Sequence, residues 1–526
     1  MALDTNLRVG RWRSALWPIR SHEMRKFFPL FILYFLVCCN YSILKMAKDA
    51  LVITAPCSGA EVIPFIKIWV VLPMAFVITY IFNHLANRHS QKKLFHIMIG
   101  IFIGFFAIFT FVLYPYRDTI HPHALCTRVQ ELLPPWCREG CGGAVALMRN
   151  WSYTLFYVMS ELWGTTILSV LLWGFTNAVI SIGEAKRYYG ILSVGTNLAA
   201  VCTGYVAAAL SPRLKKPLFL ANSDRWGGYL ELVTIIVILV GLLTMYIFHR
   251  FHKSLTDQDS ELRTRLSRPF KAERKSGLSI RRNFAYLKNS EYLICIAVLV
   301  VGFNLSMNLV ELVWKNQIKL LHPNPNDFNA YMGKVFIATG WLSTFVGLFL
   351  CSNMIRRFGW TISALVTPVI VLVTAACFFL FTVFREHTTA ITWAMALGHT
   401  PPALGVFLGT VQNIFSRTCK YTLFDATKEI AFIPLNAESG LKGKAAIDGI
   451  GSRIGKSGGS LIQGGLLMGF GSIAAATPWA GAILLIIGTC WINATRRLGR
   501  KFQTLSKEAK EGDNTPVATE SPATVP

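Results

Sequence analysis

Lysines interrupt segments of this chain that are otherwise apolar and long enough to cross a lipid bilayer. Lys48 and Lys67 lie 19 positions apart in the first half, and Lys315 and Lys334 repeat that spacing in the second half. A charged side chain is costly inside a membrane, so it usually faces the interior of a helix bundle or a wet cavity. Because one shift of 267 residues relates the two pairs, they predict a central, pseudo-symmetric site for an anion.

The composition indicates a polytopic membrane protein. Of the 526 residues, 53% are hydrophobic and only 15% are charged, and the mean hydropathy is +0.46. In a soluble protein the net charge of +25 would suggest a nucleic-acid partner, but membrane proteins with many cytoplasmic loops are basic for another reason. We therefore expect a lipid bilayer around the chain, no nucleic acid and no obligate protein partner.

Twelve segments of about 20 or more residues can be drawn as membrane spans. Basic stretches precede the first span and follow the second, sixth, eighth and twelfth, so the positive-inside rule places both termini and the long middle loop in the cytoplasm. The layout predicts an all-α polytopic membrane protein with twelve transmembrane helices in two pseudo-symmetric six-helix bundles, major-facilitator-like. The expected spans are 28–54, 62–86, 93–113, 151–180, 185–210, 228–250, 291–315, 328–352, 359–384, 390–416, 441–471 and 475–495.

The same pattern divides the chain into five parts. A cytoplasmic N-terminal segment is expected at 1–27, and the N-terminal six-helix bundle at 28–250. A basic cytoplasmic linker follows at 251–290, and the C-terminal six-helix bundle at 291–498. The cytoplasmic tail at 499–526 is predicted to be disordered, because most of it is rich in Glu, Pro, Thr and Ala without an apolar period.

Charged residues cluster in a few of the expected spans, where basic groups outnumber acidic ones by eight to four. An excess of buried cations needs an anion, and a ligand with two or three phosphates would supply it through charge-assisted hydrogen bonds. The candidate phosphate-binding residues are Lys45, Lys48, Lys67, Lys334, Lys444, Arg453 and Lys456. The candidate gating or charge-balancing residues are Asp49, Glu161, Glu311, Lys315 and Asp448.

A second interpretation is that these charges only pair with one another and hold the two bundles together. It explains Glu311 and Lys315, which are four residues apart on one helix, but not the whole set with its surplus of cations. In the eleventh span a glycine recurs at every fourth position, at Gly451, Gly455 and Gly459. That spacing predicts a close approach to a neighbouring helix.

Other residue types give weaker signals. Aromatic residues near the charged set could stack on a base ring or simply pack, and we leave that choice open. The loop 114–150 is expected to be external, where one disulfide among its three cysteines is conceivable without a defined pairing. We find no ligand spacing for a metal and no nucleophile–base arrangement, so we expect no metal site, no cofactor and no catalytic residues. The aromatic residues are Trp163, Trp314, Tyr188 and Tyr189, and the cysteines are Cys126, Cys137 and Cys141.

Several longer motifs, spread from about residue 17 to about residue 500, resemble one known family. The chain is similar to the nucleotide transporters of plastids and intracellular bacteria, which are called ADP,ATP carriers or ATP/ADP translocases and differ from the mitochondrial carrier. The motifs include Lys48-Asp49, Ser58-Gly59-Ala60-Glu61, Ser160-Glu161-Leu162-Trp163-Gly164, Lys420-Tyr421-Thr422-Leu423-Phe424-Asp425, Lys442-Gly443-Lys444 and Gly455-Lys456-Ser457.

The resemblance implies a secondary transporter in a bacterial inner membrane, not an enzyme. It implies exchange of external ATP for internal ADP, with or without phosphate, by alternating access. The alternatives are a proton-coupled nucleotide importer or an exchanger of other nucleotides on the same fold, and a membrane enzyme or receptor for phosphorylated ligands is a third class. The positions important to the family map onto Lys48, Glu161, Glu311 and either Lys444 or Lys456.

The chain departs from the family pattern at two places. The family often has Arg-Asp before its Lys-Asp pair, where this chain has Lys45-Met46. Cys57 replaces the first glycine of the Ala-Pro-Gly-Ser-Gly loop. The missing acid changes the charge balance beside Lys48, which leaves the substrate and the mode of exchange open.

Overall fold

The protein is all-helical in a computed structural model, and ten helices of its described part are long and apolar enough to cross a membrane. The structure describes residues 19, 23–134, 138–213, 224–258, 264, 266, 290–435, 447 and 451–513. Almost all of the expected N-terminal segment and linker lies outside these residues. The ten helices are Met24–Ile53, Val62–Arg88, Gln91–Leu113, Trp151–Val179, Arg187–Leu210, Arg225–Asp257, Glu291–Leu321, Pro325–Cys351, Asn353–Phe384 and Ile473–Leu505.

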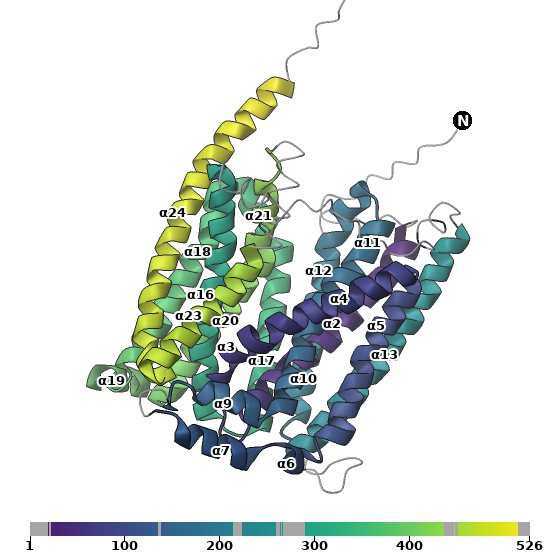
Figure 1. Cartoon of the computed structure of the whole chain (residues 1–526). Coiled ribbons are helices and arrows are strands. Elements are labelled where there is room, and N and C mark those ends of the chain that lie inside the picture. The colour runs from purple at the N-terminus through teal and green to yellow at the C-terminus, as the bar shows by residue number, and fades with distance from the viewer. Residues whose placement is uncertain are drawn as a thin grey trace, which may run out of the picture.

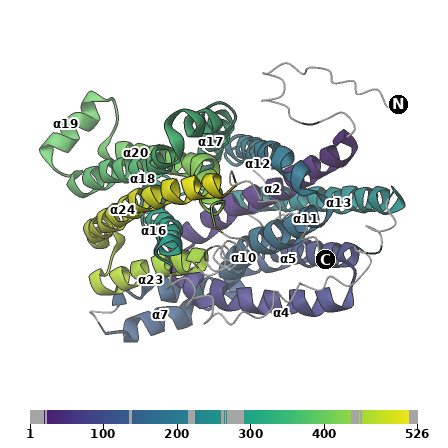
Figure 2. The same ribbon diagram turned by 90° about the horizontal axis from the view of Figure 1, so that it is seen from above.

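The helices before and after the linker form two groups that lie side by side (Figures 1 and 2). The first group comprises α2 (Met24–Ile53), α3 (Val62–Phe65), η2 (Ile66–Val71), α4 (Leu72–Arg88), α5 (Gln91–Ile108), η3 (Phe109–Leu113), α6 (Arg117–Ile120), α7 (His123–Leu132), α9 (Gly142–Arg149), α10 (Trp151–Trp163), η4 (Gly164–Leu172), α11 (Trp173–Val179), α12 (Ile182–Leu210) and α13 (Arg225–Gln258). The second comprises α16 (Glu291–Leu321), α17 (Pro325–Phe345), η5 (Val346–Cys351), α18 (Ser352–Phe384), α19 (Thr388–Ala396), α20 (Pro401–Cys419), η6 (Lys420–Phe424), α21 (Asp425–Ala431), α23 (Ser452–Phe470) and α24 (Ile473–Asp513).

One expected span, 390–416, is interrupted in the structure. The chain turns after α19, where Gly398 adopts a φ of +72° that favours glycine. A new helix begins at Pro401, because proline is tolerated in the first turn but would break a helix interior. This helix continues without a gap through η6 to Ala431. The true helix therefore begins later and extends well beyond the predicted end.

The tail prediction is also wrong in part. Helix α24 runs from Ile473 through Asp513, so its regular structure occupies the first half of the segment 499–526 that we expected to be disordered. Figure 1 shows this helix projecting beyond the two groups. The sequence of this segment lacks an apolar period. Helix α24 is nevertheless already formed before residue 499, and extending an existing helix requires no new nucleation. Residues 514–526 lie outside the described residues.

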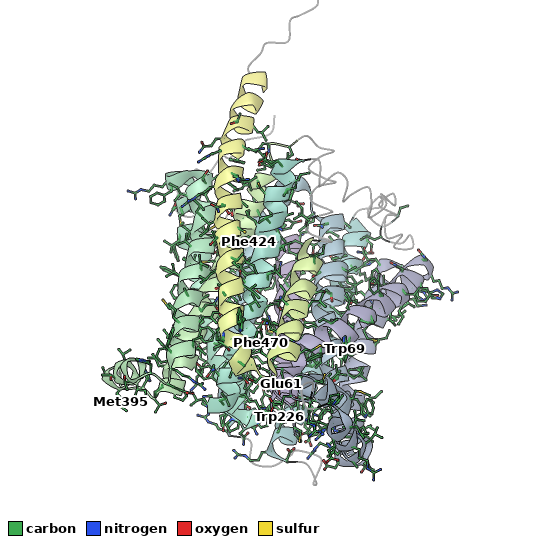
Figure 3. All side chains as sticks on the ribbon, turned by 60° about the vertical axis from the view of Figure 1, so that its left-hand side comes forward. Glu61, Trp69, Trp226, Met395, Phe424 and Phe470 are labelled. Atoms are coloured by element: carbon green, nitrogen blue, oxygen red, sulfur yellow. The ribbon has the colours of Figure 1, made fainter. Side chains whose placement is uncertain are left out.

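The two groups touch near one end of the molecule, which we call the loop end because α6, α7 and α9 lie there (Figure 1). The opposite end, where α2 begins and α24 ends, we call the terminal end. Helix α12 packs against α17, and Ser211 donates a hydrogen bond of 2.9 Å to the backbone oxygen of Asn326. Helix α3 packs against α23, and Figure 3 shows Glu61, just before α3, at the level of Phe470 at the end of α23.

Glycines let α23 approach α16 closely, as the spacing predicted. A Cβ atom added at Gly455 would come within 2.7 Å of the Asn304 Cβ, and one added at Gly459 within 2.8 Å of the Asn308 Cβ. Both lengths are shorter than real contacts of this type, so only glycine fits without movement. The prediction is confirmed for these two positions, whereas Gly451 has no such close neighbour on α16.

We expect Gly455→Val to destabilise the purified protein by about 1–3 kcal/mol, the usual cost of forcing extra atoms into a packed contact. The matched control is Gly464→Val on the same helix, where an added Cβ meets nothing within 4 Å. Thermal unfolding in detergent measures both variants. Equal melting temperatures for the two would contradict the close packing of α23 on α16.

Candidate functional site

A chain of ion pairs crosses the centre of the molecule from one group of helices to the other. It begins at Glu161 on α10, whose carboxylate lies 3.1 Å from Lys48 on α2. Lys48 lies 3.4 Å from Asp49, and Asp49 lies 2.8 Å from Lys315 on α16. The link between Asp49 and Lys315 therefore joins the first group to the second.

The chain continues within the second group. Lys315 lies 2.9 Å from Glu311, one helical turn away on α16. Glu311 also accepts a hydrogen bond of 3.1 Å from the guanidinium of Arg417 on α20. Three cations thus alternate with three carboxylates along the chain, so each charge lies beside at least one of opposite sign. This alternation offsets the desolvation of charges taken out of water.

The centre of the chain is the most deeply buried part. The Asp49 side chain is 1% exposed, and those of Lys48 and Lys315 are each 3% exposed. Lys48 also lies over the ring of Tyr157, with its ammonium 3.5 Å from the ring centroid. That contact supplies a cation–π attraction on the side of Lys48 that faces α10. The two outer carboxylates are more accessible, with Glu161 at 34% and Glu311 at 20%.

Three further predicted cations surround this chain without a carboxylate of their own. Among the described residues, none of Lys45, Lys67 and Lys456 has an acidic side chain within ion-pair distance. Their charges nevertheless act on Glu161, so they belong to the same electrostatic cluster. The Lys67 ammonium donates a hydrogen bond of 2.8 Å to the Asn308 side chain, which joins η2 to α16.

The remaining predicted residues do not join the described cluster. Lys334 on α17 is exposed, and its charge acts on His322 at the loop end. Lys444 and Asp448 lie outside the described residues, and the side chain of Arg453 on α23 does too. The structure thus brings together nine charged residues: Lys45, Lys48, Asp49, Lys67, Glu161, Glu311, Lys315, Arg417 and Lys456.

Arg417 is the residue that the sequence reasoning missed. The expected span ended at residue 416, one position before Arg417, so Arg417 was not among the charged residues considered within the spans. In the structure it lies near the middle of the continuous helix from Pro401 to Ala431, and its side chain is only 9% exposed. Recognising Pro401 and Pro402 as a helix start would have moved the predicted span toward the C-terminus and placed Arg417 within it.

The four aromatic residues considered as base partners have other roles in packing or hydrogen bonding. Trp163 and Trp314 are fully buried, and their indole groups donate hydrogen bonds to Val37 and Thr410 respectively. Tyr188 is buried against Phe27. The hydroxyl of Tyr189 donates a hydrogen bond to Asn177, and its ring packs edge-on against Trp173.

Of the cysteines considered for a disulfide, Cys126 is a free thiol and is buried in the short helix α7. Cys137 lies outside the described residues. A disulfide in the loop 114–150 is therefore not formed through Cys126.

The site has the chemistry of a binding site for an anion. Its ammonium and guanidinium groups donate charge-assisted hydrogen bonds, and lysine and arginine together suit phosphate oxygens. A charged cluster between two groups of membrane-spanning helices is the feature expected of a transporter. In its fold, the chain resembles the crystal structure of a bacterial homologue of the iron transporter ferroportin in an inward-facing state, with a TM-score of 0.52 at 14% identity over 90% of this chain and 100% of that one.

Sequence comparison identifies the family. The sequence model described as TLC ATP/ADP transporter matches residues 3–502. ADP,ATP carrier protein 1 of Chlamydia muridarum (strain MoPn / Nigg) is 44% identical over 507 residues, which are 95% of this chain and 93% of the relative. The chloroplastic ADP,ATP carrier protein 2 of Arabidopsis thaliana is 38% identical over 493 residues, 94% of this chain and 77% of the relative.

The chain therefore belongs to the TLC ATP/ADP transporter family. The predicted family is confirmed, and so is the prediction of a transporter rather than an enzyme.

We expect the Asp49–Lys315 pair to be strongly coupled. Asp49→Ala or Lys315→Ala alone leaves a buried charge without compensation and should destabilise the protein by roughly 3–5 kcal/mol. The double variant should lose less than the sum of the two, as measured by thermal or denaturant unfolding in detergent.

The surface pair Lys501–Glu291 supplies the control for this cycle. Its side chains are 41% and 58% exposed, so the same double-mutant cycle should give a coupling of no more than about 1 kcal/mol. Purely additive losses at Asp49 and Lys315 would show that the two charges do not depend on each other.

Proposed function

We propose that this protein exchanges external ATP for internal ADP, with or without phosphate, across a bacterial inner membrane by alternating access. The observation that carries the proposal is the surplus of positive charge in the central cluster. Six cations of the described residues face three carboxylates there, which leaves a net charge of six minus three, or plus three. The phosphates of a nucleotide are the natural counter-charge.

The relatives support the nature of the anion. The Chlamydia and Arabidopsis relatives are both named ADP,ATP carriers, and the identity extends over nearly the whole of this chain. A nucleoside di- or triphosphate presents several oxygens to the six cations at once, as the surplus requires. Lys45, Lys48, Lys67 and Lys456 are the cations that we assign to phosphate. We extend the same role to Lys334, Lys444 and Arg453, whose contacts with the cluster are not described.

The proposed architecture has twelve transmembrane helices in two six-helix bundles, 28–250 and 291–498. The helices α20 and α23 would complete the set, because each has 19 residues and packs against α16. The basic linker 251–290 and both termini would lie in the cytoplasm, which makes the loop end the external face. The contacts between the groups at the loop end then correspond to a state that is closed toward the outside.

Opening the external face would require the link between the bundles to break. Asp49–Lys315 is that link near the site, and the backbone oxygen of Ser58 accepts a further bond across the groups from Lys319. Phosphates that bind Lys48 and Lys315 would replace Asp49 as their counter-charge. Substrate could therefore loosen the link at the moment when its own charge stabilises the exposed lysines.

The same surplus explains exchange instead of one-way transport. Without substrate, a cavity that changes its orientation carries unpaired cations through a low-dielectric environment, and this raises the free energy of the intermediate. With substrate bound, the charges are balanced. The empty protein is therefore expected to reorient slowly and the loaded protein quickly.

The first test is uptake of radiolabelled ATP into proteoliposomes that contain the purified protein. We expect uptake into vesicles loaded with ADP and little uptake into empty vesicles. Uptake that is independent of internal ADP and collapses when a protonophore is added would support the proton-coupled alternative, in which Glu161 or Glu311 carries the proton. A panel of other nucleotides measures base preference in the same assay.

The second test is Lys48→Ala in the same vesicles. We expect at least a tenfold loss of exchange, because one lost charge-assisted hydrogen bond is worth roughly 1.5–3 kcal/mol and each 1.4 kcal/mol is tenfold. Arg500→Ala on the exposed part of α24 is the matched control, since it removes a cation far along the chain from the cluster. Full exchange by the Lys48 variant would refute its assignment to phosphate.

A further inference from the structure

We infer that Tyr41 and Tyr421 form the subsite for the aromatic base of the nucleotide, on the terminal-end side of the phosphate-binding cations. This inference rests on the proposed function, because it assigns a binding site to the base of the nucleotide whose phosphates bind the cations. The two residues come from different groups, Tyr41 from α2 and Tyr421 from η6. A base held between them would contact both bundles.

Tyr41 lies directly beside the phosphate cluster. Its hydroxyl interacts electrostatically with Glu161, Lys48 and Arg417, and the Lys45 ammonium lies 5.6 Å from its ring centroid. The ring rests on Gly164 at the start of η4, where an added Cβ would come within 2.6 Å of the Tyr41 ring. Glycine at this position therefore fixes where the ring can lie.

Tyr421 has an accessible ring within a continuous helix. Its side chain is 43% exposed, and it lies in the π-helical turn η6, a distortion that is frequent at functional sites. The Lys420 ammonium lies 4.7 Å from its ring centroid and covers one face of the ring. A base would stack on the other face.

The two tyrosines lie near the same cations, one on each group of helices. Their hydroxyls interact electrostatically with each other and with Arg417. The Lys45 ammonium lies over the Tyr41 ring and interacts electrostatically with the Tyr421 hydroxyl. The rings do not stack on each other, and neither hydroxyl has a hydrogen-bond partner among the described residues. Two unused donors and two aromatic rings near one another are suited to hold a purine by stacking and to read its edge.

Both tyrosines lie toward the terminal end from the cations on their own helices. Tyr41 precedes Lys48 by seven residues, or about 10 Å along α2 toward the terminal end. Tyr421 follows Arg417 by four residues, or about 6 Å in the same direction along its helix. A ligand with its phosphates at Lys48 and Lys45 would therefore extend its base toward the two tyrosines.

The experiment compares two probes on the purified full-length protein: ATP, and inorganic tripolyphosphate, which carries phosphates without a base. Binding is measured by calorimetry in detergent. We expect Tyr421→Ala to weaken ATP binding by about ten- to hundredfold, the usual effect of losing one aromatic stacking partner, and to leave tripolyphosphate binding unchanged. Gly164→Ala should act in the same selective way by displacing Tyr41. Tyr421→Phe should retain most ATP affinity, because the ring remains.

Tyr246→Ala is the matched control, since Tyr246 on α13 is 59% exposed and lies outside the cluster. Melting temperatures establish that each variant is folded. Equal loss of both probes in Tyr421→Ala, no loss of either, or unaltered protein that binds ATP no more tightly than tripolyphosphate would each overturn the base subsite. Lys48→Ala separates the two proposals: loss of both probes supports the phosphate site, and unchanged binding of both refutes it, whatever the result at Tyr421.

Discussion

One buried carboxylate links the two groups of helices at the centre of the charged cluster. Asp49 lies between Lys48 of its own helix and Lys315 of the other group, at 3.4 and 2.8 Å, and is almost fully removed from solvent. A buried carboxylate is stable only if positive charge lies beside it. The two buried lysines likewise need negative charge beside them. The outer pairs with Glu161 and Glu311 complete this compensation. Contact between the two groups near the site therefore depends on charges that neither group can satisfy alone.

The ion pairs and the surplus cations have different consequences. Lys48 and Lys315 each have two carboxylate partners, so they hold the helices together even without a ligand. Lys45, Lys67 and Lys456 have none among the described residues, so in the proposed exchange they would supply the attraction for an incoming anion. An anion that satisfies the second set also competes with Asp49 for the first. Binding and opening are thereby coupled through shared lysines, without a separate signalling element.

Sequence reasoning could reach much of this arrangement but not its pairing. The lysines stood out because charge within apolar spans is rare, and Glu311–Lys315 could be predicted because residues four apart share a helix face. The partners Asp49 and Lys315 lie 266 positions apart, and only tertiary packing brings them together. Arg417 was missed through a shifted helix boundary. Lys334 was included by analogy with Lys67, yet the first is exposed and the second donates a hydrogen bond to Asn308.

The internal symmetry of the chain is kept where charge must be balanced and lost where a ligand must be oriented. Lys48 and Lys315 correspond in the two halves, but the residue after each differs, Asp49 in one and Asn316 in the other. Glu161 lies three residues before η4 and Arg417 three residues before η6, so the two groups carry opposite charges at the same distance before a π-helical turn. A nucleotide has a polyanion at one end and an aromatic base at the other. A strictly symmetric site would bind a nucleotide equally well in two opposite orientations. In the proposed site, the differences between the two halves would favour one orientation.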